Sequence, residues 1–302
     1  LIAFVIYINM IIWPIRQMGQ LLSDMAKASV SISRIYEVLD LPEEDYDYGI
    51  RDVSFSEKIE FKNVSLKVND NVVLDNISFV LNAGESLGVI GSTGSGKSMI
   101  VYLLLGFFET TSGEILIDGI NIKEINKRYI REKISAIMQD SELFNMSILE
   151  NIKIVNNDID ENSIYNATMI SSIHNEILNF SSKYETIVVD NGVNLSGGQK
   201  QRISIARSLL KPFEVLILDD SLSAVDMNTD LKINNALKSM DRKFTSIFIS
   251  HRISTITNCD NIIVMDAGKI VESGTHSELI KKNGIYSKIN EIQSKEYDVS
   301  NE

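Results

Sequence analysis

The residues best suited to chemistry lie in the stretch GSTGSGKS, from Gly91 to Ser98. The stretch satisfies the spacing G-x-x-x-x-G-K-[ST], follows an apolar run typical of a strand and precedes a predicted helix. Glycines allow backbone N–H groups to curve around a phosphate, and the start of the helix directs its positive end at the same anion. Lys97 is expected to reach the β- and γ-phosphates of a nucleotide, and the Ser98 hydroxyl to coordinate Mg²⁺.

A second candidate is the stretch LILDDSLSAVD, from Leu216 to Asp226, in which an apolar run leads into two consecutive carboxylates. A buried strand delivers a metal-binding carboxylate to its carboxyl end in this way. We therefore expect Asp219 to bind Mg²⁺ beside Ser98. Asp220 lies where an enzyme that hydrolyses nucleotides would keep its general base.

A third candidate is the stretch NLSGGQKQRISIARSLL, which reads as a polar cap followed by an amphipathic helix. The plain interpretation is an ordinary capped helix. However, a serine and two glycines at the positive end of a helix form a second anion site in a chain that already has one. The residues of this second site are Ser196, Gly197, Gly198 and Gln199.

The elements that position these motifs alternate between short strands and helices. Residues 215–220 and 245–250 are short continuous apolar runs, typical of strands covered on both faces. The tail after Ile292 is polar and is expected to fray. The other predicted elements are strands at 59–68, on either side of a turn at 82–84, and at 112–119, a helix at 98–107, mainly helix over 139–211, and a hairpin around 266–269.

The N-terminal stretch LIAFVIYINMIIWP is apolar apart from Asn9, and residues 15–39 read as its helical continuation. The run is shorter than the roughly 20 apolar residues of a membrane-spanning helix and has no basic region typical of a signal peptide. It is either a buried helix of a soluble protein or the cut end of a transmembrane helix. We favour the cut helix, because Trp13 at the polar boundary suits an interfacial anchor.

Composition excludes some classes of function. The chain carries 29 basic and 41 acidic residues, and its net charge of −12 argues against non-specific binding of nucleic acid. Its single cysteine, Cys259, rules out a disulfide within the chain and is expected to be a small core residue. His174 and His276 belong to no motif and are expected to be surface or structural residues.

Several ordered motifs resemble those of ATP-binding cassette (ABC) proteins. Leu195–Gln199 reads LSGGQ, the signature of that family, and lies upstream of LILDD as the family requires. The resemblance covers about residues 59 to 289 and also includes the phosphate loop, Gln139 in AIMQDSELF, Asp219, Asp226 in SAVD and His251 in ISHR. The first 39 residues resemble the last transmembrane helix of an exporter-type subunit and its cytosolic extension.

The resemblance implies an α/β fold. It consists of a P-loop NTPase core with an antiparallel β subdomain and an α-helical signature subdomain, preceded by one long helix. The implied domains are 1–40, the end of a transmembrane domain; 41–57, a linker; 58–290, the nucleotide-binding domain; and 291–302, a C-terminal tail. The implied location is the cell membrane, with the nucleotide-binding domain on the cytoplasmic side.

The resemblance also implies roles for residues. Two cassettes close head to tail, so that each ATP lies between the phosphate loop of one subunit and the signature of the other. Gln139 would join Ser98 and Asp219 at Mg²⁺ and link them to the membrane domain, and His251 would hold the γ-phosphate and the attacking water. The residues assigned to this chain's own nucleotide are Gly91, Ser92, Thr93, Gly94, Ser95, Gly96, Lys97, Ser98, Met99 and Val68.

Three positions depart from the family pattern. Asp220 replaces the usual catalytic Glu, Val68 stands where an aromatic residue normally stacks on adenine, and Met99 replaces a common Thr. The Asp220 carboxylate is set back by more than about 1 Å, a displacement that can cost on the order of 100-fold in rate. We therefore expect this site to bind ATP and hydrolyse it slowly. Some exporters pair such a half with another half that keeps Glu, and the intact signature here fits that heterodimer.

Other interpretations remain open. The chain could form a homodimeric exporter with two equivalent, slower sites. A soluble structural or DNA-repair cassette is disfavoured by the acidic charge and the apolar N-terminus, and a regulatory module without turnover is a third possibility. Import is less favoured than export, because importer cassettes are usually separate soluble chains.

Overall fold

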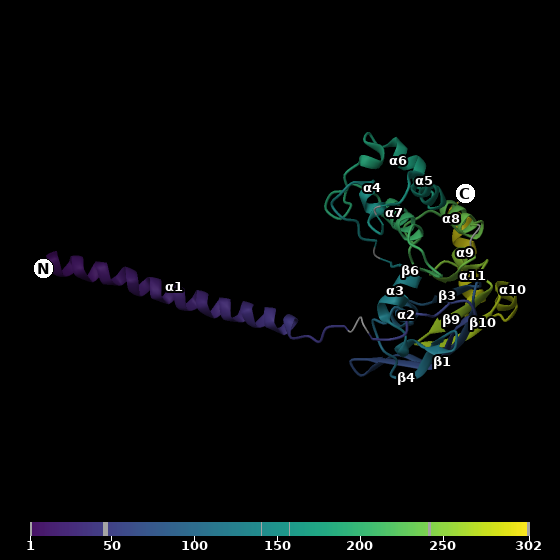
Figure 1. Cartoon of the computed structure of the whole chain (residues 1–302), viewed down its shortest axis with the longest axis horizontal. Coiled ribbons are helices and arrows are strands. Elements are labelled where there is room, and N and C mark those ends of the chain that lie inside the picture. The colour runs from purple at the N-terminus through teal and green to yellow at the C-terminus, as the bar shows by residue number, and fades with distance from the viewer. Residues whose placement is uncertain (1, 45–47, 140, 157, 241–242, 301–302) are drawn as a thin grey trace. The chain divides into compact units, whose positions relative to one another are not determined.

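The computed structural model describes residues 2–44, 48–139, 141–156, 158–240 and 243–300 of the 302-residue chain (Figure 1). The chain divides into two compact units, Leu1–Tyr46 and Asp47–Glu302.

The first unit contains a single described helix, α1 (Ile2–Leu39), and Pro14 lies within it. Asn9 donates its side-chain amide to the Val5 carbonyl oxygen at 3.1 Å, so the helix itself satisfies the polar residue of the apolar run. With 38 residues, α1 is long and apolar enough to cross a membrane, judged by length and composition. Its side chains are exposed within the described chain.

The central sheet of the second unit has six strands in the order β10–β9–β3–β8–β7–β6. Strands β6, β7, β8, β3 and β9 are parallel, whereas β10 pairs antiparallel with β9. The bounds are β3 (Ser86–Gly91), β6 (Ile134–Ile137), β7 (Val215–Asp219), β8 (Thr245–Ile249), β9 (Asn261–Asp266) and β10 (Lys269–Gly274). Strands β7 and β8 are buried along their whole length, as predicted from their continuous apolar runs.

A second sheet is antiparallel, with the order β2–β1–β4–β5. Its strands are β1 (Lys58–Val68), β2 (Asn71–Asn82), β4 (Ser112–Ile117) and β5 (Ile120–Asn121). Asn69 and Asp70 connect β1 to β2 with φ values of 49° and 64°, which asparagine and aspartate tolerate in tight turns. This sheet is the antiparallel β subdomain that the sequence predicts.

Helices α4 to α7 form a separate group in Figure 1. Their bounds are α4 (Ile148–Lys153), α5 (Glu161–Ile170), α6 (His174–Asn179) and α7 (Gly197–Leu209), with the 3₁₀ turn η2 (Lys183–Glu185). The other helices are α2 (Lys97–Leu104), α3 (Lys127–Lys133), α8 (Met227–Lys238), α9 (Ile253–Ile256), α10 (His276–Lys281) and α11 (Ile285–Ser300), with the turn η1 (Ile122–Glu124).

Three clusters of buried apolar side chains hold the second unit together. The first joins the two sheets and α2, and includes Phe61 stacked on Phe79 with ring centroids 4.4 Å apart. The second includes residues of β7, β8, α8, α9, α10 and α11. The third is the core of the α4–α7 group. The helical subdomain thus has its own core, and α7 is held in place within the α4–α7 group by packing against it.

Cys259 and the two histidines outside the motifs have structural environments. Cys259 belongs to the second core cluster, and burial raises the pKa of its thiol to about 12, as expected of a core cysteine. The Nδ1 atom of His174 lies 2.8 Å from the Tyr184 hydroxyl, and that of His276 lies 2.8 Å from the Tyr286 hydroxyl. These contacts confirm the prediction of structural residues.

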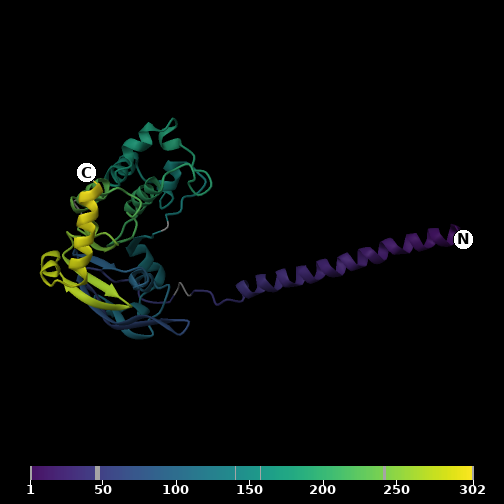
Figure 2. The ribbon, with the colours of Figure 1, turned by 180° about the vertical axis from the view of Figure 1, so that it is seen from behind.

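The structure departs from the predicted elements in three places. The last helix, α11, reaches Ser300, so the expectation of a frayed tail after Ile292 is wrong; Figure 2 shows this helix in yellow. Strand β6 was not predicted, because it has only four residues and obtains its register from β7. Part of the predicted linker packs against the domain, because Val53 and Phe55 are buried in the first core cluster.

Candidate functional site

The phosphate loop connects β3 to α2, as its spacing predicts. Gly94 and Gly96 have φ values of 80° and 94°, a region that residues with side chains rarely adopt. A Cβ atom at Gly91 would lie 2.2 Å from the Met265 carbonyl oxygen, so the loop also needs glycine there to approach β9. At Gly94 an added Cβ would meet nothing within 4 Å, and this side of the loop is open.

The Lys97 side chain folds back and contacts the loop that precedes it. Its ammonium group donates hydrogen bonds to the carbonyl oxygens of Gly91 and Ser92, both at 2.9 Å. Burial lowers the pKa of Lys97, while the nearby carboxylates of Asp220 and Asp219 oppose that change. An ammonium group has three donors, so two carbonyl contacts leave one for a phosphate oxygen.

The loop fits an anion on a further observation. The hydroxyl oxygen of Ser95 is buried and has no hydrogen-bond partner among the described residues. A buried polar atom without a partner is unfavourable unless a ligand or water satisfies it. Together with the remaining donor of Lys97 and the open side of the loop at Gly94, this hydroxyl makes the loop suitable for a phosphate group.

Asp219 ends strand β7 and is 3% exposed. Burial raises the pKa of its carboxyl group, the Ser98 hydroxyl lowers it by hydrogen bonding, and the charge of Asp220 raises it again. No group of three or more His, Cys, Asp or Glu side chains that could hold a metal occurs in the described part of the chain. Mg²⁺ is usually held by one or two protein carboxylates together with substrate phosphates and waters, so the Ser98–Asp219 oxygen pair fits this ion.

Gln139 lies two residues beyond the end of β6 and is exposed. Strand β6 pairs in parallel with β7, with Ile137 opposite Leu218. The carboxyl ends of neighbouring parallel strands lie at the same edge of a sheet. Gln139 and Asp219 therefore lie at the same edge of the sheet, although no described hydrogen bond or ion pair joins their side chains.

Asp220 points both carboxylate oxygens at His251. Its Oδ1 accepts a hydrogen bond from the His251 backbone N–H at 3.2 Å, and its Oδ2 lies 3.1 Å from His251 Nε2. The residue has φ of 46° and its N–H donates to the Ile249 carbonyl oxygen at 2.9 Å. Aspartate tolerates this left-handed conformation better than most residues with side chains. The structure thus pairs the two side chains that the family pattern assigns to hydrolysis.

The loop around His251 is held from two further directions that the sequence did not reveal. Arg252 donates to the carbonyl oxygens of Val225 and Ser223 at 2.7 and 2.8 Å. From α11, Gln293 donates to the His251 carbonyl oxygen at 2.7 Å and accepts from the Ile253 N–H at 2.9 Å. Gln293 lies in a polar tail without a motif, so no sequence signal could have found it.

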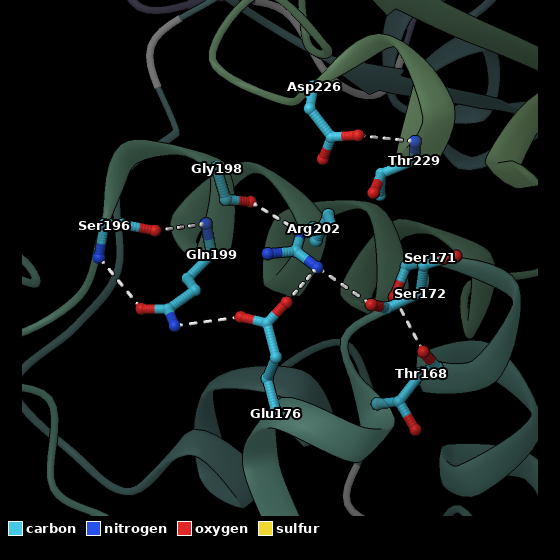
Figure 3. Close-up of polar contacts among 10 residues, drawn as sticks. All are labelled: Thr168, Ser171, Ser172, Glu176, Ser196, Gly198, Gln199, Arg202, Asp226 and Thr229. Carbon is cyan, nitrogen blue, oxygen red and sulfur yellow. Dashed lines mark hydrogen bonds and ion pairs between the residues drawn. The ribbon is translucent and has the colours of Figure 1, made fainter. Parts of the chain in front are cut away.

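Ser196 caps α7, and its capping box includes Gln199 (Figure 3). Ser196 Oγ accepts from the Gln199 N–H at 3.2 Å, and Gln199 Oε1 accepts from the Ser196 N–H at 2.9 Å. A Cβ atom at Gly198 would lie 2.8 Å from the Ala224 carbonyl oxygen. This glycine therefore allows the start of α7 to pack against the loop that follows β7.

The loop from Ser223 to Asp226 connects the motifs. Gln201 on α7 donates to Ser223 Oγ at 3.1 Å and accepts from the Ala224 N–H at 3.0 Å. Asp226 caps α8, accepting from the Thr229 N–H at 3.0 Å (Figure 3), and the hydrogen bonds with Thr229 lower the pKa of its carboxyl group. Arg252, which follows His251, also donates hydrogen bonds to this loop. Helix α7 and the loop around His251 therefore both contact residues 223–226.

Two predicted cofactor-binding residues lie in packed environments. Val68 ends β1, is half-buried and packs against the first core cluster. Met99 in α2 also packs against that cluster, and its N–H donates to the Gly96 carbonyl oxygen at 3.0 Å. Val68 thus offers only part of a small apolar side chain to a ligand.

The structure gathers the predicted site residues into two groups. The first group interacts through charges and hydrogen bonds at the carboxyl edge of the central sheet, and it comprises Lys97, Ser98, Asp219, Asp220 and His251. The signature residues instead begin α7 in the helical group. A P-loop fold with a capped signature helix and a loop that links it to the sheet edge defines an ATP-binding cassette domain.

Comparisons with known proteins agree with this class. Residues 74–223 match the family described as ABC transporter, and the chain belongs to this family. It is 38% identical, over 95% of its length, to ABC transporter B family member 24, mitochondrial, of Arabidopsis thaliana, and covers 43% of that protein. It is 34% identical, over 99% of its length, to the ATP-dependent lipid A-core flippase of Syntrophus aciditrophicus, and covers 50% of it.

A solved structure is also similar. The structure of a bacterial Atm1-family ABC exporter with ATP bound matches with a TM-score of 0.82 and 30% identity, over 89% of this chain and 48% of the other. The predicted fold class is therefore confirmed. The chain spans about half the length of the curated relatives that it matches.

Proposed function

We propose that this chain is the ATP-binding and ATP-hydrolysing part of an ABC exporter subunit and couples ATP use to export across a membrane. The observation that carries the proposal is the convergence of Lys97, Ser98, Asp219 and His251 at one sheet edge in a chain that also has a capped signature helix. Neither feature alone requires a transporter. The names of the relatives, which include a flippase and a solved exporter, support export.

The proposed organisation follows the family. We assign residues 1–40 to the end of a transmembrane domain, 41–57 to a linker whose last part packs against the domain, 58–290 to the nucleotide-binding domain and 291–302 to a C-terminal tail that begins within α11. The length and apolar character of α1 support the first assignment and a membrane location. The nucleotide-binding domain would then lie on the cytoplasmic side.

Different residues would bind the phosphates, hold Mg²⁺ and act in hydrolysis. Lys97 and the loop amides bind and orient the β- and γ-phosphates, and Ser95 offers its unpaired hydroxyl. Ser98, Asp219 and Gln139 would hold Mg²⁺, which supplies positive charge that offsets the charge of the phosphates. His251 would hold the γ-phosphate and the attacking water, with Asp220 orienting its ring through Nε2.

We further propose that this site turns over slowly. Asp220 is one methylene shorter than the usual Glu, and both of its oxygens are occupied by His251. A base that is set back by about 1 Å loses on the order of 100-fold in rate. Binding needs the loop, Lys97, Ser98 and Asp219, all of which are in place, so ATP binding would persist.

The partner is a second cassette subunit. In a head-to-tail pair, Ser196, Gly197 and Gly198 of this chain face the nucleotide of the partner. An intact signature beside a shortened base favours a heterodimer in which the partner keeps Glu. A homodimer with two equal, slower sites is the alternative, and identification of the chains that copurify with the full-length subunit separates the two.

The test uses the full-length subunit with its copurified partner in lipid nanodiscs. We expect the protein to be recovered from membranes and to hydrolyse ATP, and we expect a Mg²⁺ chelator to abolish turnover. Recovery of the full-length protein from the soluble fraction, or ATP turnover that is indifferent to the chelator, would contradict the proposal.

A further inference from the structure

Glu176 lies on α6, outside every motif of the sequence analysis, yet it contacts the signature. Its two carboxylate oxygens have different partners (Figure 3). Oε1 accepts from Arg202 Nη1 at 2.6 Å, and Oε2 accepts from Gln199 Nε2 at 2.9 Å. One side chain of α6 therefore binds two residues of the signature helix.

The contact with Gln199 determines which way its amide faces. A side-chain amide has a donor end and an acceptor end, and Glu176 can pair only with the donor end. The acceptor end is then left for the N–H of Ser196, which donates to Gln199 Oε1 at 2.9 Å. Without the carboxylate, the amide could turn over and lose this acceptor.

The capping box links the oriented amide to Ser196 as a whole, because the amide oxygen holds the Ser196 N–H while the Gln199 backbone N–H holds the Ser196 hydroxyl oxygen. Ser196 Oγ accepts from the Gln199 N–H at 3.2 Å, which uses the oxygen lone pair on the helix side. The hydroxyl proton is then free to point outward, where the positive end of α7 favours an anion. A hydroxyl held in this way acts as a fixed donor.

The contact with Arg202 neutralises the negative charge of Glu176. A carboxylate near the start of α7 would repel an approaching phosphate, but Arg202 neutralises it at 2.6 Å. Partial burial opposes ionisation of Glu176, yet the hydrogen bonds from Arg202 and Gln199 prevail and lower its pKa. Arg202 also donates to the carbonyl oxygens of Gly198 and Ser172 at 3.1 and 2.8 Å, so it is itself fixed.

We propose that Glu176 is a positioning residue of the signature. Through Gln199 it sets the Ser196 hydroxyl toward the γ-phosphate bound by the partner cassette, and through Arg202 it does so without adding net charge. The inference rests on the proposed function, because it assigns the signature to the nucleotide of the partner.

The test is a double-mutant cycle on ATP turnover by the full-length pair in nanodiscs at saturating ATP. Ser196→Ala and Glu176→Ala should each lower kcat by about tenfold, the effect of one lost charge-assisted contact. The double variant should be no slower than Ser196→Ala alone, because Glu176 acts through Ser196. If the two losses multiply instead, Glu176 does not act through Ser196 and the inference is overturned.

Control variants separate positioning from folding. Glu185→Ala removes an exposed carboxylate from the same helical group and should keep normal turnover. Glu176→Gln keeps the size of the side chain and one acceptor, so it should fold and lose less activity than Glu176→Ala. Photolabelling of this chain by 8-azido-ATP should be unchanged in the Glu176 variants, because its own phosphate loop is not altered.

The outcomes also separate this inference from the proposed function. If Ser196→Ala slows the pair while Glu176→Ala matches the wild type, the positioning role is wrong and the proposed function stands. If Ser196→Ala has no effect on a pair that hydrolyses ATP, the proposed role of the signature is wrong and the inference falls with it.

Discussion

The phosphate loop and the signature both lie at the start of a helix, but their polar groups are held in different ways. In the loop, Lys97 donates to two carbonyl oxygens of its own loop and Ser95 has no described partner. In the signature, Ser196 and Gln199 satisfy each other, and Glu176 and Arg202 support them from neighbouring positions.

This difference indicates what each region depends on. The phosphate loop gains partners when a ligand arrives, so we expect single charges there to decide binding. The polar groups of the signature are already paired with one another and with Glu176 and Arg202, and we expect bulk and orientation there to decide turnover. The following predictions test that contrast, beginning with the largest effect.

Loss of the loop lysine should have the largest effect on binding. Lys97→Ala in the full-length protein should abolish the rise in melting temperature that ATP produces, because it removes the charge-assisted contact to the phosphates. Lys269→Ala, which removes an exposed lysine paired with Asp75 at 3.1 Å, should keep the rise. An ATP-induced shift that survives in Lys97→Ala would show that the phosphate site lies elsewhere.

Restoring the longer base should raise turnover of this chain's own site. Asp220→Glu should increase it by up to about 100-fold, because the carboxylate would extend beyond its present contacts with His251. The measurement is ATP turnover of a pair in which the partner's own site has been disabled. An unchanged rate would mean that a step other than base catalysis limits this site.

The adenine side of the site should show a moderate effect. By the family pattern, Val68 stands where an aromatic ring normally stacks on adenine, so we expect about 1–3 kcal/mol of base stacking to be absent, by analogy with single-strand binding proteins. GTP should therefore compete well with ATP in the melting assay, and Val68→Tyr should increase the preference for ATP. A strong preference for ATP in the wild-type chain would show that another residue covers the base.

Release of the His251 loop from α11 should have the smallest effect. Gln293→Ala removes the donor to the His251 carbonyl oxygen and the acceptor for the Ile253 N–H. In the Asp220→Glu background, we expect turnover to fall several-fold, in line with a net effect of about 1 kcal/mol. Ser294→Ala on the same helix is the control. Equal rates for both variants would exclude a role for α11 at this site.

The sequence predicted the fold where the pattern is local. The continuous apolar runs of β7 and β8 indicated buried strands, and the turn at Asp266–Lys269 indicated the β9–β10 hairpin. Strand β6 escaped prediction because its four residues form a strand only through pairing with β7. Helix α11 escaped because its apolar residues are sparse and Tyr286 is buried only in the folded second cluster.

The candidate site shows the same limit. Motif spacing placed Lys97 and Ser98 where the phosphate loop meets its helix and Asp219 at a strand end, since each motif carries its own geometry. Nothing in the spacing indicated that Glu176 would meet Gln199 or that Gln293 would reach the loop around His251. Such contacts join residues from distant segments, and only the packing of separate helices brings them together.

The central claim is the division of labour between this chain's slow site and the signature that completes the site of its partner. The direct test compares Ser196→Arg with Asp220→Asn in the purified full-length pair at saturating ATP. Ser196→Arg places bulk at the start of α7, where a γ-phosphate would bind, and should lower turnover on the order of 100-fold. Asp220→Asn should change turnover little if the site it serves is slow, as we propose. If Asp220→Asn silences the pair while Ser196→Arg keeps near-normal turnover, the division is reversed and this chain carries the working site.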